Sequence, residues 1–208
     1  MTTITADMVK QLREETGAAI LDCKNTLEET GGDFEKAKEI LAEKGLAKAA
    51  KKAGREVSEG IVEVYSHTGG RVGVLVELNC ETDFVANTDK FQAYAHDIAL
   101  HVAFHDPLYL DTDSIPEDVL EAKKKEFYDE AKEQGKPDNV IEKIVEGKLD
   151  KYLADSCLLM QPFVKDEDIT VADLVQKAIA ELQENIRVSR FARFEVGNVG
   201  DDEETDEE

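Results

Sequence analysis

The chain has 208 residues, of which 41% are hydrophobic, and this is enough to bury the core of one large domain or two small ones. Its formal net charge is −22, and a surface of that sign repels phosphate backbones, so no direct nucleic-acid partner is expected. No apolar run is long enough to cross a bilayer, and the N-terminus lacks the features of a secretory signal. We therefore expect no membrane partner and a cytoplasmic location, or one in an organelle interior.

The N-terminal quarter of the chain is predicted to form three short amphipathic helices. The first ends at Thr16-Gly17 and the second at Thr30-Gly31-Gly32, where glycine supplies the conformation that a helix end prefers. Asp33 is a suitable N-cap for the third helix, which is expected to end before Gly45. The apolar faces of such helices are buried by packing against one another. Residues 1–54 are therefore predicted to be a three-helix domain with a linker helix.

Three segments have the pattern of β-strands. Ile61–Tyr65 and Val72–Leu78 are joined by Gly69-Gly70, which is a strong hairpin signal, and the second strand is apolar on both faces, as an inner strand would be. Residues 186–196 alternate with period two and are predicted to pair with this hairpin. The side chains expected to share one face of that third strand are Val188, Arg190, Ala192, Phe194 and Val196.

Helices are predicted between these strands, at about 87–103, 116–134 and 138–155 and from Thr170 onward, with an extended apolar segment at 158–164. The helices at 116–134 and 138–155 are separated by a Gly-Lys-Pro break and should form a helical hairpin. The predicted fold class is therefore α+β, with a small antiparallel three-stranded sheet in a core domain of residues 55–198. Residues 199–208 are predicted to be a disordered acidic tail.

The three cysteines, Cys23, Cys80 and Cys157, form no C-x-x-C pair and leave an odd count. This usage is typical of buried thiols in a reducing compartment and not of a disulfide or zinc framework.

The basic segment from Lys44 to Arg55 has no interleaved aromatic residues and is interpreted as the solvated face of a helix and linker. Since the cysteine pattern indicates no metal framework, we expect no cofactor.

Asp97, His101 and His105 are spaced four residues apart on a predicted helix, so a metal-binding face has to be considered. The sequence has no H-E-x-x-H motif, and His105 lies directly before the helix-ending Asp106-Pro107. Ordinary packing or capping roles are therefore favoured over a metal site.

The turn within Leu78–Asn87 is the candidate functional stretch, because there the inner strand stops at a polar segment containing Asp83-Phe84. The pair could simply begin a helix, with Phe84 in the core and Asp83 in the first turn, where negative charge is favoured. Alternatively, a rigidly held ring beside a carboxylate could be inserted into a partner. Spacing alone favours the first interpretation.

The chain lacks a Gly-rich phosphate loop, a G-x-S-x-G motif and a cysteine with a plausible histidine partner. This favours a protein that works through its surfaces over an enzyme. A helical interaction adaptor and a metal-dependent enzyme that uses Asp97, His101 and His105 remain as alternatives.

Five motifs of the chain are informative together: Leu12 to Ala18 followed by Asp22-Cys23-Lys24, Lys48 to Ala53, Asn79 to Ala86, Gln161 to Asp166 and Arg193 to Gly197. They closely resemble motifs of elongation factor Ts, the guanine-nucleotide exchange factor of the GTPase elongation factor Tu. The resemblance covers the chain to about Gly197, in the order and spacing of the family.

The resemblance implies a ubiquitin-associated-like N-terminal module that docks on the GTPase domain, in which Arg13 is a contact residue. The methionine pair usual in the family is replaced by Ile20-Leu21, which keeps this surface apolar, although bundle core is the alternative role for at least one of them. The resemblance also implies that Thr82, Asp83, Phe84 and Val85 form a wedge, which enters near the magnesium and phosphate site and promotes GDP release without covalent chemistry. Elongation factor Tu, GDP-bound or nucleotide-free, would be the partner.

The chain resembles the short form of the family, because it contains one N-C-E-T-D-F-V turn and one R-F-E-V strand. Longer members carry two related core modules. A short chain can supply the second module by two-fold association, so a homodimer is expected, with the sheet around Val188 to Val196 and neighbouring core elements as its interface.

Overall fold

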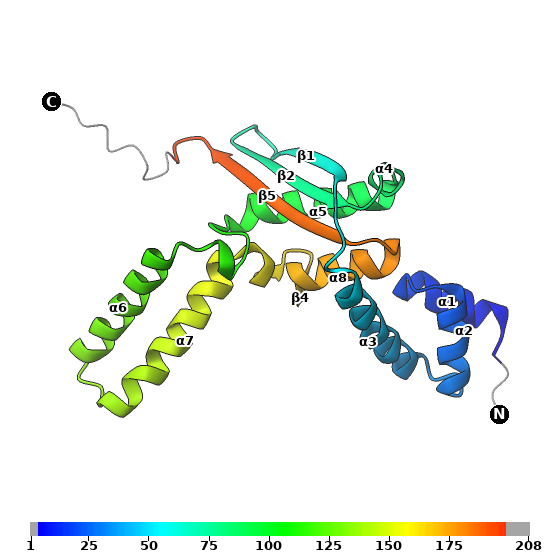
Figure 1. The fold of residues 1–208 in the computed structure, drawn as a ribbon, viewed down its shortest axis with the longest axis horizontal. Coiled ribbons are helices and arrows are strands. Elements are labelled where there is room, and N and C mark those ends of the chain that lie inside the picture. The colour runs from blue at the N-terminus through cyan, green and yellow to red at the C-terminus, as the bar shows by residue number, and fades with distance from the viewer. Residues whose placement is uncertain (1–3, 199–208) are drawn as a thin grey trace. The chain divides into compact units, whose positions relative to one another are not determined.

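The computed structural model describes residues 4–198, which form an α+β fold and confirm the predicted class (Figure 1). The helices of this part are α1 (Ala6–Thr16), α2 (Ile20–Glu29), α3 (Phe34–Lys52), α4 (Asp83–Ala86), α5 (Asp89–His105), α6 (Glu117–Glu133), α7 (Asp138–Ser156) and α8 (Val171–Leu182). The strands are β1 (Glu59–Ser66), β2 (Val72–Cys80), β3 (Pro162–Phe163), β4 (Asp166–Thr170) and β5 (Ile186–Glu195). None of the helices described is long and apolar enough to span a membrane. The predicted acidic tail lies outside the described residues.

The described chain divides into two compact units, and several elements contribute residues to both. The first unit contains the N-terminal residues through Val62, together with Glu77–Ala95 and Asp173–Arg187. The second contains Glu63–Val76, His96–Ala172 and the residues from Val188 onward.

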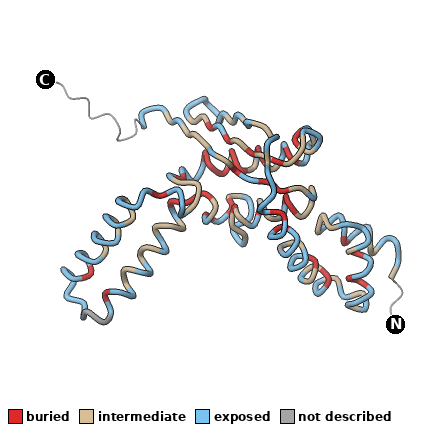
Figure 2. Tube along the Cα trace, viewed as in Figure 1, coloured by how far each residue is buried: buried red, intermediate tan, exposed pale blue. Residues whose placement is uncertain are grey.

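In the first unit, α1, α2 and α3 pack around a small core of their own, as predicted, and Figure 2 shows buried stretches within these helices. Its buried members are Leu12, Cys23, Leu27, Ala37 and Leu41. The predicted caps are present: Asp33 accepts a hydrogen bond from the Lys36 backbone N–H (3.2 Å), and Gly17 ends α1 with φ +67°.

The prediction that the third helix ends before Gly45 is wrong, because α3 continues through Gly45 to Lys52. A Cβ atom at Gly45 would lie 3.3 Å from the Cβ of Ala180 on α8. The glycine therefore permits a close approach of two helices and is not a stop signal.

The main sheet has the strand order β1-β2-β5, which confirms that the second predicted strand is central. Alternate residues of β2 are buried, namely Val74, Val76, Leu78 and Cys80. Gly60 lies so close to the Leu78 carbonyl of the neighbouring strand that a Cβ atom there would collide with it.

The face predicted to be shared along the third strand has no uniform environment. Val188 is buried, whereas Phe194 is 72% exposed. The residue before Phe194, Arg193, donates to the Ala103 carbonyl of α5 (3.4 Å) and pairs with Asp106 (3.3 Å), so Phe194 points away from that helix. Strand periodicity alone does not reveal which end of the strand is covered.

In the second unit, α6 and α7 form the predicted helical hairpin, joined through Gly135 with φ +68°. The segment predicted as extended at 158–164 begins instead with a 3₁₀ turn, Leu158–Met160, before β3. β3 pairs antiparallel with β4 in a second sheet of two strands, which the sequence analysis did not predict.

A buried histidine ties β3 and the end of α7 to α5. His101 is fully buried, its Nε2 lies 2.9 Å from the Gln161 side-chain oxygen, and its Nδ1 accepts from the Val164 backbone N–H (3.2 Å). Gln161 in turn donates to the Asp155 carbonyl (2.6 Å). These partners require the neutral ring with its proton on Nε2, and burial lowers the pKa of His101 to about 4.

We expect acid to destabilise the protein through His101. Its folded-state pKa lies below the ordinary value of 6.5, so the unfolded chain binds more protons between these values and stability falls as the pH drops from 6.5 towards 4. The loss should be on the order of 3 kcal/mol at the acid end. Urea unfolding at a series of pH values measures it. His101→Gln should flatten this part of the profile, and a profile as steep as that of the parent would contradict the role of His101.

Candidate functional site

The residues of α4 divide between solvent and core. Ala86 is buried and Val85 half-buried, whereas Asp83 is exposed and the Phe84 side chain is 82% exposed. The interpretation of Phe84 as a core residue is therefore wrong for this chain. A large apolar ring is thus held in water at the tip of a turn, where a binding partner can reach it.

Hydrogen bonds fix both ends of this turn. The Thr82 hydroxyl accepts from the Val85 backbone N–H (3.4 Å) and so caps α4. The Thr88 hydroxyl donates to the Val85 carbonyl (2.8 Å) and accepts from the N–H of Phe91 (3.2 Å), a fully buried residue of α5. The tip is thus tied to the core directly behind it.

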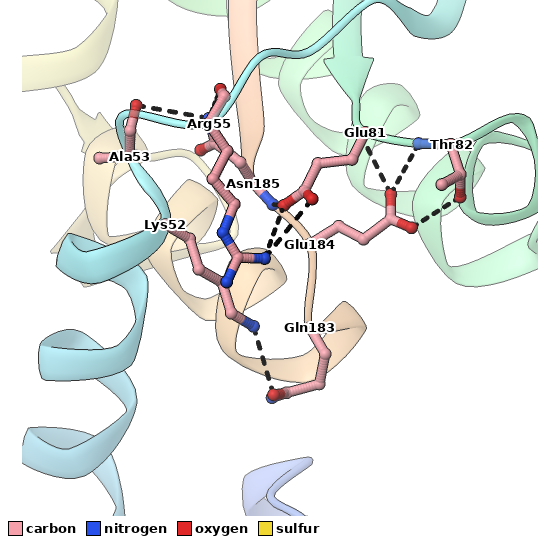
Figure 3. A network of polar contacts seen from close by, with 8 residues as sticks. All are labelled: Lys52, Ala53, Arg55, Glu81, Thr82, Gln183, Glu184 and Asn185. Carbon is pink, nitrogen blue, oxygen red and sulfur yellow. Dashed lines mark hydrogen bonds and ion pairs between the residues drawn. The ribbon is translucent and has the colours of Figure 1, made fainter.

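A carboxylate from the other end of the chain holds the base of the turn (Figure 3). One oxygen of Glu184 accepts from the backbone N–H groups of Glu81 (3.1 Å) and Thr82 (3.0 Å). Its other oxygen accepts from the Thr82 hydroxyl (2.6 Å). Glu184 follows α8, so the segments before α4 and before β5 are joined side by side.

The Glu81 side chain in turn binds the segment that contains Glu184. Its carboxylate accepts from the Asn185 backbone N–H (2.6 Å) and from the Arg55 guanidinium (3.3 Å). The hydrogen bond from Asn185, and then the charge of Arg55, hold the pKa of Glu81 below its usual value. Asn185 also donates to the Arg55 carbonyl (2.7 Å), so the segment that follows α3 joins the same network.

Cys80 supports the turn from below. Its thiol is fully buried and donates to the Thr82 carbonyl at 3.1 Å. Burial, with a smaller contribution from the charge of Glu184, raises the pKa of Cys80 to about 11. The thiol therefore remains protonated at neutral pH, acts as a donor and is a poor nucleophile.

The N-terminal candidate residues are also on the surface. Ile20 and Leu21, the first residues of α2, are 58% and 66% exposed, so the alternative that one of them belongs to the bundle core is wrong. Arg13 is exposed in the last turn of α1. The turn between these helices is held by the N–H of Ala18, which donates to the Thr16 hydroxyl (3.3 Å).

A model of the family described as elongation factor TS matches residues 4–198. The chain belongs to the elongation factor Ts family. Elongation factor Ts of Carboxydothermus hydrogenoformans is 56% identical over 194 residues, which cover 93% of this chain and 89% of the relative. For Elongation factor Ts of Fervidobacterium nodosum the identity is 54%, and the shares are 93% and 98%. Elongation factor Ts of Desulfosudis oleivorans is 49% identical over 95% of this chain and all of its own.

Membership in the elongation factor Ts family implies a nucleotide-exchange role on elongation factor Tu and no covalent chemistry. The alternative metal site at Asp97, His101 and His105 is not assembled, because both ring nitrogens of His101 are engaged with protein groups. Between residues 4 and 198, no group of three histidine, cysteine or acidic residues is placed to hold a metal ion.

The motif that resembles the family contains Thr82, Asp83, Phe84 and Val85, but no motif contains Glu184, which holds the base of the turn. Glu184 is separated from Thr82 by 102 residues and belongs to no motif with a local signature. One available signal was the polar run from Gln183 to Asn185 between an amphipathic helix and a strand, where such residues often bind backbone groups.

Because Phe84 contributes little to the core, we expect Phe84→Ala to leave stability nearly unchanged. The free energy of unfolding should differ from that of the parent by less than about 0.5 kcal/mol. Phe91→Ala removes a fully buried ring in the next helix and should cost about 3–5 kcal/mol. Urea unfolding of the two variants provides the comparison, and a large loss in Phe84→Ala would show that the ring packs in solution.

Proposed function

We propose that this protein promotes GDP release from elongation factor Tu and so allows GTP to rebind, by inserting the Asp83-Phe84 turn near the magnesium and phosphate site. The observation that carries the proposal is the exposed ring of Phe84 on a turn braced by Glu184, Cys80 and Thr88. The protein would act in the cytoplasm or an organelle interior, wherever its partner works.

The mechanism is a competition between two binding modes. Mg²⁺ requires near-octahedral coordination and is held by few protein groups and the phosphates, so a small displacement of its surroundings weakens the bound nucleotide. Burying an aromatic side chain contributes about 1.5–3 kcal/mol, enough to offset such a displacement. By linkage, a factor that weakens GDP binding must itself bind more weakly when GDP is present.

A second contact would supply affinity. Arg13 on α1 and Ile20 and Leu21 on α2 are exposed, and apolar side chains with an arginine are typical of binding surfaces. We propose that this domain, residues 1–54, docks on the GTPase domain while the core domain, residues 55–198, presents the wedge.

We expect Phe84→Ala to slow the release of labelled GDP from elongation factor Tu at saturating factor by at least about tenfold, because the ring can no longer drive the displacement. The matched variant Ile20→Ser/Leu21→Ser should raise the factor concentration needed for half-maximal release and leave the maximal rate unchanged. Stopped-flow fluorescence with intact proteins gives both quantities.

The adaptor alternative predicts a different result in the same assay. An adaptor would bind elongation factor Tu or another partner without accelerating release, and Phe84→Ala would then have no effect on the rate. Unchanged release by Phe84→Ala with normal binding would exclude the wedge mechanism even if exchange itself occurs.

We further propose a homodimer formed through the open face of the sheet. Within the second unit, Val64 is 69% exposed and Phe194, Val196 and Leu75 are also exposed. The N–H of His67 donates to the Val72 carbonyl (2.9 Å), and counting three residues along each strand places Val64 opposite Leu75. The neighbouring side chains of β1, Glu63 and Tyr65, contact His96 of α5, so Val64 points away from that helix.

A second copy of the chain suits this face because a two-fold interface brings identical apolar side chains together. It would also supply the second core module that longer family members carry.

We expect Phe194→Asp to convert the dimer to a monomer, because the interface would bury an unpaired charge. Light scattering at micromolar concentration measures the mass. Tyr128→Asp, at a partly exposed aromatic residue on α6, is the matched control and should remain dimeric. A monomeric parent protein with full exchange activity would refute the dimer proposal.

A further inference from the structure

The hydroxyl group of Thr82 makes two hydrogen bonds that depend on each other. It has one hydrogen, which it donates to Glu184 (2.6 Å), and its oxygen accepts from the N–H of Val85 (3.4 Å). Directing the hydrogen at Glu184 leaves the lone pairs of the oxygen towards Val85. The carboxylate therefore orients the cap of the short helix that carries Phe84.

The carboxylate of Glu184 also fixes the backbone from which α4 begins. It accepts the N–H groups of two successive residues, Glu81 and Thr82, and charge-assisted bonds of this kind are stronger than neutral ones. With the hydroxyl bond, three donors on adjacent residues converge on one side chain. No single water molecule could replace it in this geometry, because water has two lone pairs.

Glu184 is itself held between two anchored neighbours. Gln183 ends α8 with a positive φ of +63° and accepts from the Lys52 ammonium (3.2 Å). Asn185 is buried and donates its side chain to the carbonyl of Arg55 (2.7 Å) and its N–H to Glu81 (2.6 Å). Figure 3 shows these side chains converging from the end of α3, the start of α4 and the end of α8.

We propose that Glu184 is a positioning residue for the Asp83-Phe84 turn, and that its network sets the turn at a fixed place relative to the end of α3. This inference rests on the proposed function and deepens it. The N-terminal helices and the turn would then meet the GTPase in one fixed arrangement, and Glu184 would act on exchange only through the direction of Phe84.

We expect Glu184→Ala to lower the maximal rate of labelled GDP release from elongation factor Tu by about tenfold, because small misplacements of a contact group cost rate steeply. The factor concentration at half-maximal release should change by less than about threefold, since the N-terminal surface is intact. Glu184→Gln retains an oxygen for both backbone N–H groups and should recover most of the rate. Stopped-flow titrations of the full chain measure both quantities.

Glu181→Gln is the matched control. Glu181 lies in the last turn of α8, three residues before Glu184, and the substitution removes its ion pair with Lys90 and weakens its hydrogen bond from Tyr94 (2.7 Å), but these partners lie beyond the turn. It should keep the maximal rate close to that of the parent. If both variants slow release equally, a general loosening of the unit explains the effect and the positioning role is refuted.

The double variant Glu184→Ala/Phe84→Ala separates this inference from the function on which it rests. If Glu184 acts through the ring, the double variant releases GDP as slowly as Phe84→Ala alone, so the two losses do not add. If the rate losses of the two single variants multiply in the double variant, the inference about Glu184 is refuted, whereas the wedge mechanism is not. A normal rate in Phe84→Ala alone would instead overturn the proposed function.

Discussion

The reciprocal pairing of Glu184 with the Glu81-Thr82 backbone, and of Glu81 with the backbone of Asn185, is the interaction on which the candidate site depends. A helix of four residues has no stability of its own, because nucleation costs more than one turn returns. Its geometry must come from tertiary contacts. Two carboxylates, each accepting backbone N–H groups of the other segment, supply these contacts with a directionality that apolar packing lacks.

The same network shows how a chain of net charge −22 uses its basic residues. The basic segment from Lys44 to Arg55 is largely exposed, as predicted, and three of its side chains form ion pairs: Lys44 with Glu29 (3.1 Å), Lys48 with Asp22 (2.6 Å) and Arg55 with Glu81 (3.3 Å). The pairs of Lys44 and Lys48 are partly exposed and contribute little each. The Arg55 side chain is equally exposed, but its backbone carbonyl accepts from the Asn185 side chain (2.7 Å), so Arg55 belongs to the network behind the turn. These basic side chains thus take part in contacts within the chain itself.

The sequence was informative wherever a local rule decides the structure. Asp33 caps a helix, glycines turn the hairpin, and the apolar run of β2 indicated a central strand. Prediction from the sequence failed where contacts between distant segments decide the structure. Gly45 carries the local signal of a helix end, but Ala180 explains it, and Phe84 has the spacing of a core residue although nothing covers it. The polar run around Glu184 does not reveal which groups it binds, because its partners lie about a hundred residues away and two of its three donors are backbone groups that any residue would present.

The exposed ring and its rigid base belong to one physical argument. A flexible loop carrying Phe84 would lose conformational entropy on insertion, about 1–2 kcal/mol for each residue ordered, which is comparable with the gain from burying the ring. In a turn already fixed by Glu184, Cys80 and Thr88, this entropy is lost during folding, where the favourable contacts of the rest of the unit offset the loss. The free energy of ring burial is then available to displace elements of the partner. This is why a binding site of one turn requires residues from the ends of α3, β2 and α8 behind it, and why its most exposed residue is the one least needed for the fold.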